Sequence, residues 1–135
     1  MNAGQYYKKN IMVVDDDPDI LLSLQELFER EGFEVTTVDN GRSCLLELEK
    51  GFQGIIILDI MMPVMDGVET IKKMTIDGFT DENTIIVLTA KRIQGEEFND
   101  IYPYIADYIT KPFDIVTLLQ TVKKIAQKPP RKRRF

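Results

Sequence analysis

The stretch GIIILDIMMPVMDG, residues 54–67, decides how this chain folds. Its apolar run Ile55–Leu58 is typical of a strand that is buried on both faces of a parallel sheet. The run ends at Asp59, and Pro63 and Gly67 follow closely, which indicates a loop. A charged side chain at the tip of a buried strand needs partners, and other strand ends in the sequence supply candidates.

The same unit, a short apolar run followed by a helical period, recurs along the chain. Strands are predicted at 11–14, 33–39, 55–58, 85–88 and 108–109, and helices near 18–31, 43–50, 68–74, 95–101 and 116–125. Asp16 or Asp17 can cap the first helix, Asp114 can cap the last, and Asn40 with Gly41 is predicted to form a turn. Five strands alternating with five helices predict an α/β fold, with helices on both faces of a parallel sheet.

Composition excludes several classes of protein. The 135 residues fit one domain, and 44% hydrophobic with 29% charged residues is typical of a globular chain. No apolar stretch is long enough to span a bilayer and the first residues lack a signal-peptide core, so we expect a cytoplasmic protein without membrane contact. Histidine is absent, which excludes histidine-based hydrolases and the usual zinc sites. The single cysteine, Cys44, is expected to pack in the core.

Charge divides the chain unevenly. The net charge is −5, yet no acidic residue follows Asp114, and the last segment, KPPRKRRF, is strongly basic. We expect an N-terminal tail at 1–9, one domain at 10–127, and a basic tail or start of a linker at 128–135. Without an aromatic platform such a tail gives at most unspecific nucleic-acid contact, so nucleic-acid binding through this domain is not expected.

Polar side chains follow the predicted strands at the point where each strand ends. Asp15 and Asp16 come after the first strand and Asp59 ends the third, so three carboxylates should meet at one edge of the sheet. Their mutual repulsion favours a cation, and hard oxygen ligands suit Mg²⁺. Thr89 and Lys111 follow the fourth and fifth strands and would face an anion held there.

Four strings share their order and spacing with one family. IMVVDDDP, IIILDIMMPVMDG, IIVLTA and DYITKPF resemble the receiver domain of two-component response regulators, over roughly Lys9 to Gln127. The resemblance implies a flavodoxin-like three-layer sandwich whose five-stranded sheet has the order 2-1-3-4-5. It also implies a signalling switch rather than an enzyme.

The resemblance assigns a role to each candidate residue. Asp59 would accept a phosphoryl group from a phosphohistidine on a sensor histidine kinase or phosphotransfer protein. Asp16 and Asp59 would bind Mg²⁺ together with the backbone carbonyl of Met61, and Asp15 would act through water. Lys111 would contact the phosphoryl oxygens.

Further residues would convey the switch. Thr89 would move toward the phosphoryl group, and Tyr108 would follow inward. These movements would change the surface of the fourth helix, fifth strand and fifth helix, where an output protein would bind. The Lys111–Pro112 peptide bond would be cis. Pro103 and Tyr104 depart from the family pattern before the fifth strand, and we expect a short or frayed fourth helix there.

Less specific interpretations remain open for single residues. Asp17 fits a helix cap better than a metal ligand. Thr89 and Lys111 could each be an ordinary strand-end or surface residue. The methionines of the loop are expected to pack around it: Met61, Met62 and Met65.

Two other functions also remain open. A receiver fold could serve as an interaction module without phosphorylation. An Mg²⁺-dependent aspartyl-phosphate hydrolase would also use an aspartate nucleophile, but it would need an acid two residues after Asp59, where the chain has Met61. A flavin-binding module is disfavoured, because three acids follow the first strand where a phosphate would bind.

Overall fold

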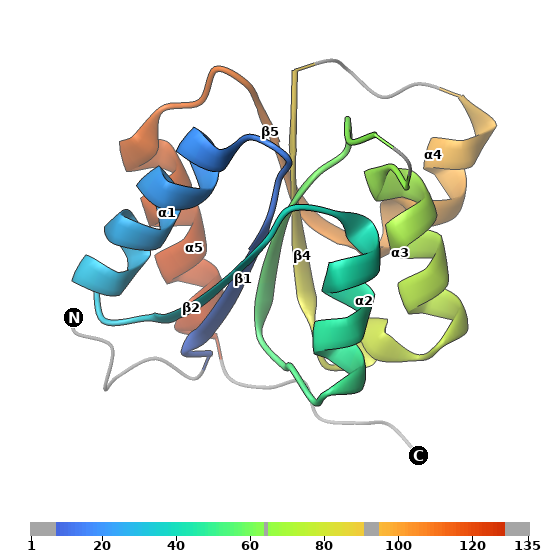
Figure 1. Ribbon diagram of the computed structural model, residues 1–135, viewed down its shortest axis with the longest axis horizontal. Helices are drawn as coiled ribbons and strands as arrows, with labels where there is room; N and C mark the ends of the chain where they lie inside the picture. Colours follow the sequence, from blue (N-terminus) through green and yellow to red (C-terminus); the bar gives the residue numbers. More distant parts are fainter. Residues whose placement is uncertain (1–7, 64, 91–94, 129–135) are drawn as a thin grey trace.

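A computed structural model describes residues 8–63, 65–90 and 95–128 of the chain. Five parallel strands form one sheet in the order β2-β1-β3-β4-β5, which confirms the predicted topology (Figure 1). The strands are β1 (Asn10–Val14), β2 (Glu34–Val38), β3 (Ile55–Asp59), β4 (Thr84–Thr89) and β5 (Ile105–Thr110). The helices are α1 (Pro18–Arg30), α2 (Gly41–Glu49), α3 (Gly67–Ile76), α4 (Glu96–Ile101) and α5 (Ile115–Ala126), with 3-10 turns η2 (Phe79–Asp81) and η3 (Tyr102–Tyr104).

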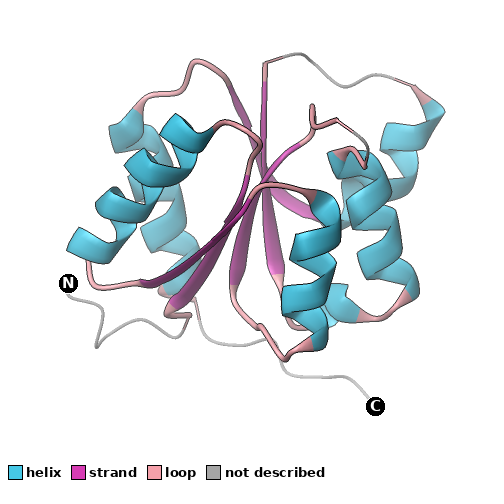
Figure 2. Cartoon of the chain, in the orientation of Figure 1, coloured by secondary structure: helices cyan, strands magenta, loops and turns pink. Residues whose placement is uncertain are grey.

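The sheet separates two layers of helices. Helices α1 and α5 cover one face, and α2, α3 and α4 cover the other (Figure 2). Successive residues of β3 point alternately into the two layers: Ile55 and Ile57 pack with α1 and α5, whereas Ile56 and Leu58 pack with α2 and α3. All four are fully buried. Each such side chain contributes about 1.5–3 kcal/mol relative to an exposed one, which explains the continuous apolar run.

Acidic or amide side chains begin four of the helices, as the sequence rules for helix starts require. Asp17, Asn40, Asp66 and Asp114 each accept a backbone N–H from the first turn of the helix that follows. The predicted caps at Asp17 and Asp114 are therefore confirmed. The prediction of a turn at Asn40 and Gly41 was wrong, because Asn40 caps α2 and Gly41 is its first residue, two positions before the predicted start.

The segment around α4 and β5 departs from expectation in length. Helix α4 has only six residues, and Pro103 lies in the 3-10 turn that follows it, so the predicted shortening is confirmed. Strand β5 is longer than predicted, with six residues. Ile105 and Asp107 pair with consecutive residues of β4, so Ala106 between them has no partner in the register. This irregularity interrupts the outer strand of the sheet, which is a common protection against pairing with another chain.

Two further predictions can be compared with the structure. Cys44 is fully buried in the layer of α2 and α3, as expected. In the part of the chain that the structure describes, every helix is too short or too polar to cross a membrane.

Candidate functional site

Two buried acids lie side by side at the carboxyl ends of neighbouring strands. Asp59 is the last residue of β3, and Asp15 directly follows β1, whose Val14 pairs with Leu58. Asp15 is 1% exposed and Asp59 is 4% exposed. The exposed Asp16 completes the cluster, since carboxylate oxygens of the three aspartates lie within 4.8 Å of one another. The structure therefore brings together the three acids that the sequence predicted to meet.

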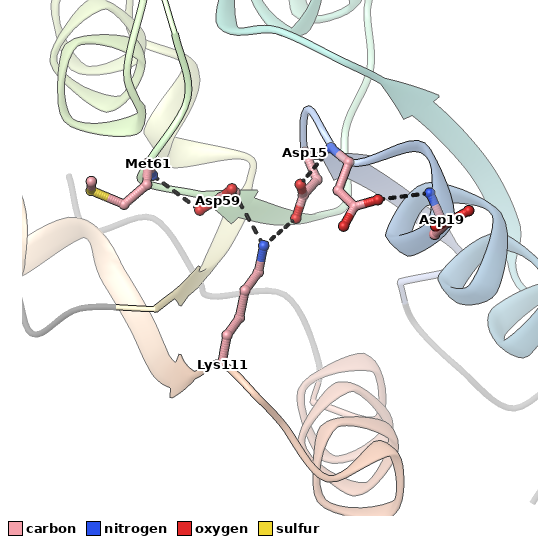
Figure 3. A network of polar contacts seen from close by, with 6 residues as sticks. Asp15, Asp19, Asp59, Met61 and Lys111 are labelled. Atoms are coloured by element: carbon pink, nitrogen blue, oxygen red, sulfur yellow. Dashed lines mark hydrogen bonds and ion pairs between the residues drawn. The ribbon is translucent and has the colours of Figure 1, made fainter.

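Lys111 supplies the positive charge between these acids. Its Nζ lies 2.7 Å from Asp15 Oδ2 and 3.3 Å from Asp59 Oδ2, so one ammonium group bridges both carboxylates (Figure 3). The Lys111 backbone N–H donates to the Thr89 carbonyl at 2.7 Å, which fixes the lysine against the end of β4. The peptide bond that follows, to Pro112, is cis as the resemblance implies.

Backbone donors orient the two buried carboxylates. Asp59 Oδ1 accepts the Met61 N–H at 3.0 Å, and Asp15 Oδ1 accepts the Asp17 N–H at 2.9 Å. Each carboxylate thus has one oxygen held by the loop that follows its own strand and the other directed at Lys111 (Figure 3). The Asp17 side chain caps α1 by accepting the Asp19 N–H, and Asp16 is the exposed member of the acid cluster.

The electrostatics of the site are unbalanced toward negative charge. Burial raises the pKa of Asp59, the Met61 N–H opposes this rise, the charge of Asp15 adds to it, and Lys111 opposes it in turn. Burial alone would lower the pKa of Lys111, but its hydrogen bond to Asp15 and the charges of Asp15 and Asp59 outweigh that effect and raise it. The lysine stays protonated, and one cation faces three acids.

The donor set fits a magnesium ion. Three carboxylates, two of them buried and one exposed, offer hard oxygen ligands at a site that is open on one side, and Mg²⁺ accepts a few carboxylates while keeping several waters. The surplus negative charge gives a cation an electrostatic reason to bind. The hydrogen bond from Met61 N–H brings the Met61 backbone to the site, and its carbonyl as a ligand stays a prediction.

The predicted switch residues lie near the site but differ in exposure. Thr89, the last residue of β4, is fully buried, whereas Tyr108 on β5 is half-buried. The rings of Tyr108 and Phe98 on α4 form a T-shaped pair with centroids 6.3 Å apart, and Phe98 forms another with Tyr102 at 5.5 Å. A chain of rings therefore connects β5 with the exposed turn η3. Movement of Thr89 and Tyr108 stays a prediction.

Sequence reasoning missed one residue that shapes the site. Gly67 begins α3, and a Cβ placed there would lie 2.7 Å from Ile60 Cα and 2.8 Å from the Asp59 carbonyl oxygen. Its N–H donates to the Ile60 carbonyl at 2.9 Å. Only glycine lets the helix approach the backbone of Asp59 this closely. The glycine that follows Pro63 is a signal of this approach in the sequence, but by itself it indicates only a loop residue.

The methionines of this loop behave differently from one another. Met62 is buried in the core as predicted, but Met61 is 52% exposed, so the expectation that it packs around the loop was wrong. Its backbone N–H donates to Asp59 Oδ1, so the contribution of Met61 to the site comes from its backbone.

Comparison with known proteins agrees with this geometry. Residues 11–123 match the family described as response regulator receiver domain. The alkaline phosphatase synthesis transcriptional regulatory protein PhoP of Bacillus subtilis is 35% identical over 123 residues, which cover 89% of this chain and 49% of PhoP. Protein PilH of Pseudomonas aeruginosa is 28% identical, over 85% of this chain and 95% of PilH. The chain thus spans about half the length of the regulatory proteins PhoP and PrrA.

Solved structures give the same result. A response regulator receiver domain protein (CheY-like) from Methanospirillum hungatei JF-1 superposes with a TM-score of 0.81 at 35% identity, covering 87% of this chain and 93% of that one. Response regulator protein TrrA from Thermotoga maritima, solved in complex with Mg(2+)-BeF, has a TM-score of 0.72 at 32% identity, covering 87% and 98%. Given the sheet order, the acid cluster with its lysine and the match over residues 11–123, this chain belongs to the response regulator receiver domain family.

Proposed function

We propose that Asp59 accepts a phosphoryl group from a phosphohistidine on a sensor histidine kinase or a phosphotransfer protein. The observation that carries the proposal is the joint contact of Lys111 with Asp59 and Asp15, beside the third acid Asp16. An aspartate that only served the fold would not require a buried like charge next to it. As a receiver domain, the chain is a signalling module whose covalent state changes.

The reaction is a transfer between two side chains. A carboxylate oxygen of Asp59 forms the bond to phosphorus, and the phosphorus–nitrogen bond of the phosphohistidine breaks, so that its electron pair returns to the imidazole. The Met61 N–H fixes one oxygen of Asp59, which orients the other for attack. Lys111 already lies 3.3 Å from that second oxygen, where its charge can neutralise the phosphoryl oxygens.

Magnesium completes the charge balance. Asp16 and Asp59, with the Met61 carbonyl and Asp15 through water, would hold Mg²⁺, which when bound supplies positive charge for the equatorial oxygens of the transferred group. This ligand set is supported by the clustering of the three acids and by the Mg(2+)-BeF complex of TrrA. Catalysis here is positioning and electrostatics, because the carboxylate itself is the nucleophile.

Phosphorylation would then alter a surface of the domain. The new group adds about −1.5 to −2 charges, as for phosphorylated side chains generally. Thr89 ends the adjacent strand β4, and its hydroxyl would donate to that group. Tyr108 would follow and change the surface of α4, β5 and α5, where an output partner would bind. We propose that this signalling takes place in the cytoplasm, with the domain boundaries at 10 and 127.

Two alternatives make different predictions. An interaction module that works without phosphorylation would not need the lysine between two acids. A hydrolase would need a general acid two residues after Asp59, and Met61 occupies that place. The favoured function therefore uses more of the observed side chains than either alternative.

Intact mass measurement tests the proposal. The protein is incubated with acetyl phosphate and Mg²⁺, and we expect the mass of one phosphoryl group to be added in the wild type but not in Asp59→Asn. Omission of Mg²⁺ should slow the gain strongly. An equal gain in Asp59→Asn, or none in the wild type, would refute the assignment.

A further inference from the structure

Helices α2 and α3 touch at a point where only a glycine fits. Gly41 is the first residue of α2, and a Cβ placed on it would lie 2.1 Å from Thr70 Oγ1 on α3 and 3.1 Å from Met65 Sδ. Gly41 and Thr70 are both buried, and Thr70 is 0% exposed. Met65 is flexible and can move aside. Thr70 is β-branched and closely packed, so it cannot.

A short series of contacts leads from Thr70 to the candidate phosphoacceptor. Thr70 Oγ1 donates to the Asp66 carbonyl at 2.8 Å, inside the first turn of α3. Asp66 caps that helix, and the next residue, Gly67, donates its N–H to the Ile60 carbonyl at 2.9 Å. As described above, Gly67 also lies against the carbonyl oxygen of Asp59. The first turn of α3 thus contacts α2 on one side and the backbone of the acid site on the other.

We propose that Gly41 and Thr70 are positioning residues for the magnesium site at Asp59. Their contact sets how closely α2 lets α3 approach β3, and the first turn of α3 in turn holds Ile60 and the Met61 backbone in place. The inference rests on the function proposed above. It adds to the magnesium site two residues that are not metal ligands themselves. Neither residue touches the reacting atoms.

A methyl group at position 41 should therefore change the metal site. Close-packed interiors transmit strain, so Thr70 and the first turn of α3 would shift rather than absorb the added volume. That shift would reach Ile60 through Gly67 and move the oxygens that are to bind the ion. Loss of groups that orient metal ligands typically costs about 10- to 100-fold in metal affinity.

Magnesium affinity, measured by NMR, provides the test. Mg²⁺ is titrated into the ¹⁵N-labelled protein, the amide shifts of Met61 and Lys111 give the dissociation constant, and a melting curve of each variant gives its stability. We expect Gly41→Ala to weaken Mg²⁺ binding by about tenfold or more. Gly41→Ala combined with Thr70→Ala should restore most of the affinity, because the side chain that occupies the space is gone.

Two further variants keep the test specific. Gly41→Ala with Thr70→Val should not be rescued, because valine retains the branch at the contact. If Gly41→Ala alone does not fold, Thr70→Ile presses on the same contact from α3 and should weaken Mg²⁺ binding in the same way.

Gly54→Ala is the matched control for a merely structural effect. A Cβ at Gly54 would lie 2.2 Å from the Asn10 carbonyl oxygen, at the opposite end of the strands from the acids. This variant should melt at lower temperature yet bind Mg²⁺ as the wild type does. Gly41→Ala with wild-type Mg²⁺ affinity, or Gly54→Ala with an equal loss of affinity, would overturn the positioning role. Absence of Mg²⁺ binding by the wild type would instead refute the proposed function, and the positioning role with it.

Discussion

Replacing Lys111 with methionine should destabilise the protein, and the loss should be larger without magnesium than with it. Methionine keeps much of the length and the apolar stem of the lysine but removes the charge that bridges Asp15 and Asp59. The two buried carboxylates then face each other without a counter-charge. In the wild type the Lys111 ammonium contributes fully below its ordinary pKa of 10.5, and the contribution is lost only as pH rises through its raised pKa.

The size of the effect follows from burial. Removing one partner of a buried ion pair costs about 3–5 kcal/mol, because the remaining charge is left uncompensated. The side chain of Lys111 is 18% exposed, whereas those of Asp15 and Asp59 are 1% and 5% exposed. Some screening by water is thus expected, and the lower end, about 3 kcal/mol at pH 7, is the appropriate expectation. For a chain of this size that corresponds to a fall in melting temperature of about 10 °C.

Urea unfolding of wild type and Lys111→Met, at pH 7 with and without Mg²⁺, measures this difference. Mg²⁺ should narrow the gap, since it supplies the missing positive charge to the same acids. The double variant with Asp59→Asn should be less destabilised than Lys111→Met alone, because one of the two opposing charges is gone. Equal stability of Lys111→Met and wild type in Mg²⁺-free buffer would refute the reasoning that the buried acids depend on this lysine.

Three further outcomes follow from individual side chains. Because the pKa of Asp59 is raised in the folded protein, ionisation of this carboxyl group opposes folding. Without Mg²⁺, the stability of the wild type relative to Asp59→Asn should therefore fall as the pH rises from the ordinary carboxyl pKa through the raised one. Urea unfolding across this pH range measures the difference in stability, and a constant difference would contradict the prediction. Phe98→Leu removes two edge-to-face ring contacts, each worth about 0.5–1.5 kcal/mol, and should lower the unfolding free energy by about 1–3 kcal/mol. Tyr104→Leu, which is outside these ring pairs, should change it less. Burial raises the pKa of the Cys44 thiol to about 12, so iodoacetamide at pH 8 should modify it only after unfolding, and rapid modification of the native protein would show that this layer of the core opens.

Local sequence rules predicted the parts of the fold that depend on neighbours along the chain. Buried runs such as Ile55–Leu58 identified the central strands, and acids at the strand ends identified the site, because the carboxyl ends of parallel strands share an edge. Asn40 shows where such rules fail. Asparagine before glycine is typical of both a turn and a helix start, and in the structure Asn40 caps α2 by accepting the Ser43 N–H.

Contacts between elements distant in sequence could not be predicted in this way. The sequence indicated that Lys111 faces the site, but not that its ammonium would pair with two acids at once. The close approaches at Gly41 and Gly67 depend on how α2, α3 and β3 pack, and a single sequence shows only that a glycine is present. The skipped residue Ala106 in β5 likewise depends on pairing with β4.

The bridge made by Lys111 has a consequence for how the pocket comes into being. Its two acidic partners lie 96 and 52 positions earlier in the chain, so these contacts close large loops and belong to the slow, non-local part of folding. During synthesis the paired acids emerge from the ribosome well before their cation does. Lys111 directly follows β5, so the two buried acids have their compensating charge only when this C-terminal strand is in place.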